Sequence, residues 1–182
     1  MLWILRQLVA IVLLPFTVAV VIPMWLARRD GLRLALGSNL GERVLQACGV
    51  GLLAIGVLLF LASLGRFMGE GRGTLAPWDP PRRLVVQGPY RYVRNPMISG
   101  VVMVLFGEAA VLLSRPHVLW ALSFLAFNAV YIPLLEEPLL AERFGADYGD
   151  YRRHVPRLLP RWRPWNPWQG RSGRRDSPVV SA

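Results

Sequence analysis

Four long apolar blocks are the feature that most constrains the fold of this chain. Each block approaches the ~20 apolar residues that a helix needs to cross the hydrocarbon core of a bilayer. The blocks are Leu8–Leu26, Val44–Leu64, Met97–Ser114 and Val118–Leu135. Of the 182 residues, 54% are hydrophobic, and they are gathered in these blocks instead of alternating with polar residues. The pattern predicts an all-α integral membrane protein with about four transmembrane helices, and it disfavours a soluble globule.

The connections between the blocks refine this prediction. The first block ends in MWLARRD, which lacks the small-residue cleavage site of a secretory signal, so we expect a retained span. The last two blocks are separated only by Arg115–His117. A connection this short predicts a tight antiparallel helical hairpin near the C-terminal half of the chain.

The arginines are distributed unequally around the blocks. All 21 basic residues are arginine, against 11 acidic residues, which gives a net charge of +10. With a cytoplasmic N-terminus, sixteen arginines lie on the cytoplasmic side and five on the other. The positive-inside rule therefore places both termini and residues 65–96 in the cytoplasm. No nucleic-acid-binding motif accompanies the arginines, so we expect the lipid bilayer and no nucleic acid as a partner.

The composition divides the chain into three regions. Residues 1–64 form a two-span N-terminal region, and residues 65–162 form a core with a cytoplasmic loop, the hairpin and short closing helices. Within the core, Gly145 predicts a helix stop and Asp147 the cap of a second short helix. Residues 163–182 are rich in Pro, Gly, Arg and Ser, which predicts a loosely ordered tail.

Isolated reactive side chains argue against disulfide and metal chemistry. Cys48 is the single cysteine, which excludes an intramolecular disulfide. His117 and His154 are far apart and have no carboxylate or cysteine at ligand spacing. We therefore predict no metal site.

Polar and small residues within the spans are interpreted as packing devices. A polar group is costly inside a membrane and normally faces the protein interior, so we expect Glu108 and Asn128 to bond across the hairpin. Substrate contact is the alternative for this pair. Gly49, Gly51 and Gly56 in the second block predict close helix packing.

Asn95 and Pro96 form a helix-start signal at the third block. The asparagine side chain can accept a hydrogen bond from an early backbone N–H, and proline suits the first helical position because it needs no donor there. The positive end of the helix dipole then lies beside Arg91 and Arg94, which favours a carboxylate or phosphate. The alternative is that these arginines and the neighbouring tyrosines only anchor the chain among lipid headgroups.

Glu136 and Glu137 follow the fourth block directly. Two adjacent carboxylates at a helix C-terminus oppose the macrodipole and repel each other, so other groups must hold them unless they are ordinary interfacial charges. The hairpin brings the end of the fourth block beside the start of the third. We therefore expect Asn95 and Glu136 to converge in one cytoplasmic pocket, with positive groups on one wall and carboxylates on the other, suited to a zwitterionic ligand.

Three motifs in combination resemble a known enzyme family. They are GPYRYVRNPMISG at residues 88–100, the Glu136–Glu137 pair, and ERFGADYGDYRRHVPRLLP at residues 142–160. Over Gly73–Pro160 the chain resembles the isoprenylcysteine carboxyl methyltransferases and the related phospholipid N-methyltransferases. The resemblance implies a cytoplasmic pocket for S-adenosylmethionine, roofed by C-terminal helices and with a lipid-accessible opening for the acceptor.

The resemblance also implies roles for individual residues. The expected catalytic residues are Arg94, Glu137 and Arg152. The expected cofactor-binding residues are Tyr90, Arg94, Asn95, Pro96, Gly100, Glu136, Glu137, Tyr148 and Tyr151. Two positions depart from the pattern, because Asn95 stands where many relatives have histidine and Ile98 where a tyrosine is frequent.

The expected function is methyl transfer from S-adenosylmethionine to a lipidic or small hydrophobic acceptor. A carboxylate or thiol is favoured, because an amine needs a base to take its proton and the motif offers no histidine. N-methylation of a phospholipid headgroup is the alternative within the family. A noncatalytic membrane scaffold or transport component is the alternative from another class.

Overall fold

The computed structural model describes residues 12–32, 34–71 and 83–166, and these form helices, turns and loops without a β-strand. The α-helices are α2 (Ile22–Arg29), α3 (Leu40–Arg66), α4 (Pro96–Leu112), α5 (Arg115–Tyr131) and α6 (Glu137–His154). The π-helical segments are η1 (Val12–Val21), η2 (Phe67–Gly71) and η4 (Ile132–Glu136), and η3 (Gly88–Arg91) is a 3-10 turn. The prediction of an all-α protein is confirmed for the described residues.

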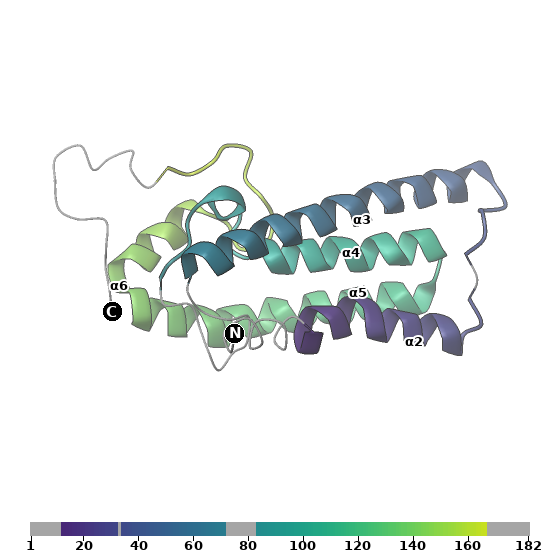
Figure 1. Cartoon of the computed structure of the whole chain (residues 1–182), viewed down its shortest axis with the longest axis horizontal. Helices are drawn as coiled ribbons and strands as arrows, with labels where there is room; N and C mark the ends of the chain where they lie inside the picture. Colours follow the sequence, from purple (N-terminus) through teal and green to yellow (C-terminus); the bar gives the residue numbers. More distant parts are fainter. Residues whose placement is uncertain (1–11, 33, 72–82, 167–182) are drawn as a thin grey trace.

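The long helices form an elongated bundle with two different ends. Figure 1 shows α3, α4 and α5 side by side along the long axis of the molecule. At one end α4 turns into α5, and α2 lies beside α5 there. At the other end lie α6 and the loop that precedes α4, so the motifs singled out in the sequence gather at a single end of the bundle (Figure 1).

Two helical stretches are long and apolar enough to cross a membrane, Leu40–Glu70 and Arg115–His154, and Pro96–Leu112 is a shorter apolar helix. Large apolar side chains remain exposed on the outer faces of these helices, including Leu58 on α3 and Leu119 on α5. An exposed apolar surface of this kind fits lipid better than water. The structure thus supports a membrane protein, while four spans remain a prediction because the first apolar block begins outside the described residues.

The predicted hairpin is present, and its turn is shorter than expected. Leu113 adopts a left-handed conformation (φ 51°, ψ 39°) and ends α4, and Ser114 precedes the first residue of α5. The interpretation of Arg115–His117 as the connection was therefore wrong. These residues form the first turn of α5, because Pro116 there needs no hydrogen-bond donor and has its φ already set.

The predicted bond between Glu108 and Asn128 was also wrong. Asn128 Nδ2 donates to the Phe124 carbonyl of its own helix at 2.9 Å, and Glu108 lines a pocket at the α4–α5 turn. The antiparallel register explains the error. Glu108 lies about six residues before the turn and Asn128 about fourteen after it, so at 1.5 Å per residue they differ in depth by roughly 12 Å.

Glycines allow α3 and α4 to approach closely. A Cβ atom added at Gly56 would lie 2.7 Å from the Gly100 carbonyl oxygen, and one added at Gly49 would lie 3.0 Å from the Gly107 carbonyl oxygen. The seven-residue spacing is the same on both helices, so the pairs meet two turns apart. The prediction of close packing is confirmed for two of the three glycines in α3. It was wrong for Gly51, whose Cβ position has no atom within 4 Å.

A bent helix carries the C-terminal motif back towards the bundle. α5, η4 and α6 follow one another without a break, and Pro133 lies at the start of η4. A π-turn at a proline accommodates the missing backbone donor without ending the helix. Gly145 then has φ 53° and ψ −127° inside α6, a backbone conformation that glycine adopts readily. The predicted interruption at Gly145 is therefore confirmed as a kink.

Candidate functional site

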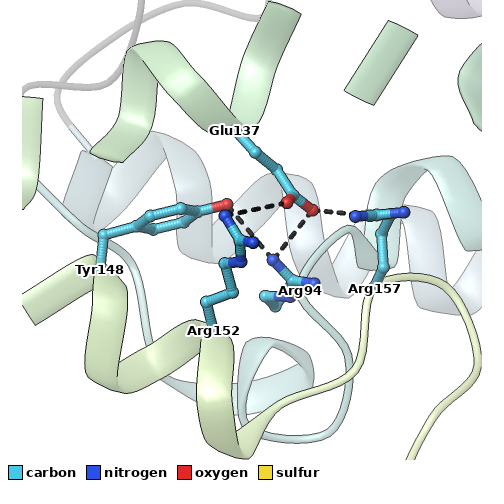
Figure 2. A network of polar contacts seen from close by, with 5 residues as sticks. All are labelled: Arg94, Glu137, Tyr148, Arg152 and Arg157. Atoms are coloured by element: carbon cyan, nitrogen blue, oxygen red, sulfur yellow. Dashed lines mark hydrogen bonds and ion pairs between the residues drawn. The ribbon is translucent and has the colours of Figure 1, made fainter. Parts of the chain in front are cut away.

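A buried carboxylate is the centre of the candidate site. The Glu137 side chain is 3% exposed and its Oε1 accepts hydrogen bonds from Arg94 Nη1 at 2.9 Å and from Arg157 Nε at 2.6 Å. Arg152 Nη1 lies 3.8 Å from Oε2, and Arg94 Nη1 also donates to the Tyr148 hydroxyl at 3.4 Å. We call these five residues the Glu137 cluster; Figure 2 shows the three guanidinium groups converging on the one carboxylate.

The loop before α4 places Arg94 in this cluster. Gly88 has φ 57° and opens η3, where the Arg66 side chain of α3 packs against it. Pro89 follows in the first turn, and Val93 is buried to 1% exposure between Arg94 and the turn. Because the loop is anchored on both sides of its arginines, Arg94 enters the interior with only 9% of its side chain exposed.

Residues 155–166, the C-terminal segment, hold the same loop through the backbone. Arg94 N donates to Pro156 O at 2.8 Å, Asn95 N to Arg157 O at 3.1 Å, and Trp165 N to the Arg91 carbonyl at 2.9 Å. The Trp165 ring also lies against the Tyr151 and His154 rings. The start of the predicted loose tail is thus held in place, and the loose order of residues 167–182 stays a prediction outside the described residues.

The electrostatics of the cluster favour a charged and rigid arrangement. A buried carboxylate is costly unless it is paired and hydrogen-bonded, and Glu137 has both kinds of partner. The hydrogen bond that Arg157 donates to Glu137 raises the pKa of that guanidinium. Three guanidinium groups surround one buried carboxylate, so the cluster keeps a positive excess that can attract an anionic group.

The expectation of separate positive and negative walls was wrong in one respect. Arg94 and Glu137 contact each other directly, because the attraction between two buried opposite charges offsets the hydration that each has lost. The expected convergence of the residues before α4 with those after α5 is confirmed by this contact. Glu136 stays half-buried, and none of the described residues donates a hydrogen bond to it.

The tyrosines expected at the cofactor lie in and beneath this site. The Tyr151 hydroxyl donates to the Tyr90 carbonyl at 2.7 Å, and both rings are buried. Burial raises the pKa of the Tyr90 hydroxyl, and nearby Tyr151, Glu136 and Glu70 add to the shift. Tyr151 therefore braces the loop, while Tyr148 contacts Arg94 itself. Their contact with a cofactor stays a prediction.

Asn95 begins α4 as predicted, but the expected side-chain cap was wrong. Asn95 has ψ 64° and its side chain makes no capping bond, whereas Asn39 has ψ 168° and accepts from Glu42 N at 2.9 Å. The cap requires an extended backbone, and the Asn95 backbone is instead held by its bond to Arg157 O. The Asn95 side chain therefore does not cap α4.

Pro96 and Gly100 lie below the cluster at the start of α4. Pro96 is fully buried, and Gly100 faces α3, where a Cβ atom would meet the Gly56 carbonyl oxygen at 2.8 Å. Both residues set the position of α4 against its neighbours. A direct contact of either with a cofactor stays a prediction.

Arg157 is the member of the cluster that sequence reasoning missed. It makes the shortest contact with Glu137, but it lies twenty residues further along the chain. The sequence feature that could have indicated Arg157 is the preceding Pro156. Proline cannot extend α6, so the chain turns there and runs back over the loop before α4. Arg152 was expected at the site and is there, although 57% of its side chain is exposed.

Comparison with known proteins connects this geometry to chemistry. A family model described as phospholipid methyltransferase matches residues 44–147. Methanethiol S-methyltransferase 2 of Bradyrhizobium diazoefficiens is 40% identical over 72 residues, which are 40% of this chain and 27% of that protein. Methanethiol S-methyltransferase of Mycobacterium tuberculosis is 37% identical over 71 residues, which are 39% of this chain and 28% of that protein. The matches thus span little more than a quarter of these curated relatives.

Proposed function

Since the chain belongs to the phospholipid methyltransferase family, we propose that it is an integral membrane methyltransferase that uses S-adenosylmethionine to methylate a lipidic or small hydrophobic acceptor. A thiol is the favoured acceptor group, because the two curated relatives are named for methyl transfer to methanethiol. We place the site on the cytoplasmic side, because the arginine-rich segments lie at that end of the bundle.

The proposal rests mainly on one observation, an unpaired hydrogen-bond donor on the Arg94 side chain. Its Nε is buried and has no hydrogen-bond partner among the described residues, while its Nη1 is held by Glu137 and Tyr148. A buried donor without a partner costs about 1–3 kcal/mol. A fixed guanidinium with one unused donor is therefore suited to an acceptor group that arrives with a ligand.

The residues at the site fit S-adenosylmethionine. Its carboxylate is an acceptor for Arg94 Nε and for the exposed guanidinium of Arg152, and its ammonium group suits the half-buried carboxylate of Glu136. The Asn95 side chain offers a further polar contact. When bound, the cofactor supplies a methyl group on a sulfonium.

The protein's own contribution is to bind, orient and exclude water. Glu137 fixes Arg94 from one side and the C-terminal segment fixes it from the other, so the cation does not have to reorganise when a ligand binds. Holding two reactants in line contributes up to roughly 7–11 kcal/mol to barrier lowering. A thiolate or carboxylate acceptor would also lose charge in the reaction, which a water-poor site favours.

The direct test is binding of labelled S-adenosylmethionine to the purified full chain in detergent. We expect saturable binding to the wild type and weaker binding to Arg152→Gln. Arg153→Gln is the matched control, since it removes the same charge one residue away on an exposed position. Absence of saturable binding to the wild type, or equal loss in both variants, would contradict the proposal.

The acceptor is tested separately by following methyl transfer to methanethiol and to phosphatidylethanolamine. Methylation of the thiol supports the proposal, and methylation of the amine headgroup supports the alternative that the family description suggests. If the protein is a noncatalytic scaffold, neither acceptor is methylated and Arg94→Ala keeps the protein's cellular function. If the wild type transfers methyl groups and a folded Arg94→Ala variant does not, the scaffold hypothesis is excluded.

A further inference from the structure

A pocket lies beside the α4–α5 turn, at the opposite end of the bundle from the Glu137 cluster. Its volume is about 270 Å³, and its walls come from η1 and from the helices α2, α3, α4 and α5. Pro23 and Ala27 of α2, Leu53 of α3, Glu108 of α4 and His117 of α5 line it. Apart from the glutamate and the histidine, every lining side chain is apolar.

This pocket is distinct from the Glu137 cluster. Glu108 lies twelve residues along α4 from Pro96, which at 1.5 Å per residue is about 18 Å. Methyl transfer requires the reacting atoms to be roughly 3–3.5 Å apart. A molecule bound beside Glu108 is therefore out of reach of a donor bound beside Arg94.

The histidine in the pocket is already satisfied. His117 is 1% exposed, its Nε2 lies 3.1 Å from the Pro23 carbonyl oxygen, and its Nδ1 lies 2.7 Å from Ser114 Oγ. A carbonyl only accepts, so Nε2 carries a proton, and Nδ1 pairs with the serine hydroxyl, which can donate or accept. The ring thus has a partner at each nitrogen and needs none from a ligand.

Glu108 is in the opposite condition. Its Oε2 is buried and has no hydrogen-bond partner among the described residues. A carboxylate in apolar surroundings is stabilised by a nearby cation or a hydrogen-bond donor, and an ionisable residue inside a membrane helix is rarely retained without such a partner. The wall of the pocket therefore includes one carboxylate whose Oε2 lacks a hydrogen-bond donor within the described chain, among side chains that are otherwise apolar except for His117.

We propose that this pocket binds a small apolar amine, with its ammonium group donating to Glu108 and its alkyl part packed against Ala27 and Leu53. The volume of about 270 Å³ suits such a molecule, since it is many times the space of roughly 10–15 Å³ that a single water needs. An ammonium supplies both the positive charge and the donor that Glu108 lacks. A neutral alcohol supplies only the donor, so it should bind less tightly.

The test is calorimetric titration of hexylammonium chloride into the purified full chain in a nonionic detergent. We expect saturable one-site binding to the wild type and to Glu142→Gln, which removes the same charge from an exposed position of α6. Glu108→Gln should bind at least about tenfold more weakly, because the charge-assisted bond is lost. Ala27→Leu should weaken binding similarly by filling the pocket while the carboxylate remains.

Three results would overturn the proposal. They are the absence of saturable binding to the wild type, equal affinity of hexanol and hexylammonium, and unchanged affinity in Ala27→Leu. If Glu108→Gln does not fold, Ala27→Leu decides the outcome, because its carboxylate is intact. If the amine only partitions into the micelles, every variant gives the same heat of titration, and that result also contradicts the proposed site.

Discussion

Replacing Glu137 with glutamine should destabilise the protein, because it leaves Arg94 charged and buried. The Arg94 side chain is 9% exposed and the carboxylate 3% exposed, so neither can be rehydrated without local opening. Glutamine keeps the shape and one accepting oxygen but removes the charge. Arg94 then keeps a hydrogen bond and loses its counter-ion.

The size of the effect follows from the burial of each partner. Breaking a buried ion pair by removing one member costs about 3–5 kcal/mol. Arg157 is 34% exposed and Arg152 57% exposed, so these two guanidinium groups recover most of their hydration and add little. Because the glutamine oxygen still accepts one bond, we expect a loss near the lower end, about 3 kcal/mol in the free energy of unfolding.

Equilibrium unfolding in mixed micelles, followed by far-ultraviolet circular dichroism, measures this loss. Glu142→Gln is the control on the same helix and should change the free energy of unfolding by less than about 0.5 kcal/mol. The double variant Arg94→Met with Glu137→Leu removes both charges. It should recover most of the lost stability, since apolar replacement of a whole buried pair is often neutral, but it should not bind S-adenosylmethionine.

A loss below about 1 kcal/mol for Glu137→Gln would refute the reasoning, because the pair would then behave as a solvent-exposed one. Failure of the double variant to regain stability would also contradict it. That result would mean that the shape of the cluster, and not its charge, determines the local packing.

Four further substitutions test the fold, each measured by the same unfolding titration. Gly56→Ala should cost about 1–3 kcal/mol, since its Cβ would lie 2.7 Å from the Gly100 carbonyl oxygen; Gly51→Ala, where nothing lies within 4 Å, should be neutral or stabilising by up to about 1 kcal/mol. His117→Leu should cost about 1–3 kcal/mol, because the buried carbonyl and hydroxyl that it now contacts lose a partner. Gly145→Ala should cost about 1–3 kcal/mol through its φ of 53°, and a neutral result there would show that the kink does not need glycine.

Local signals in the sequence predicted the main elements of the fold. Apolar blocks predicted helices, Pro96 marked the first turn of α4, and Gly145 marked the kink in α6. These signals are reliable because each residue sets the backbone conformation at its own position and at its immediate neighbours. The short connection between two of the blocks was sufficient to predict that the residues before α4 and after α5 would meet.

The sequence by itself thus determined that this is a helical chain with apolar helices and that Arg94 and Glu137 lie at the same end of a hairpin. Only the tertiary structure decided that Glu137 is buried among arginines, that Arg157 is one of its partners, and that Glu108 lines a separate pocket. The physical reason is that the burial and pairing of a side chain depend on which segments, distant in the sequence, pack against it. The path of the chain after α6 and the register of α4 against α5 are set by packing, which no local pattern records.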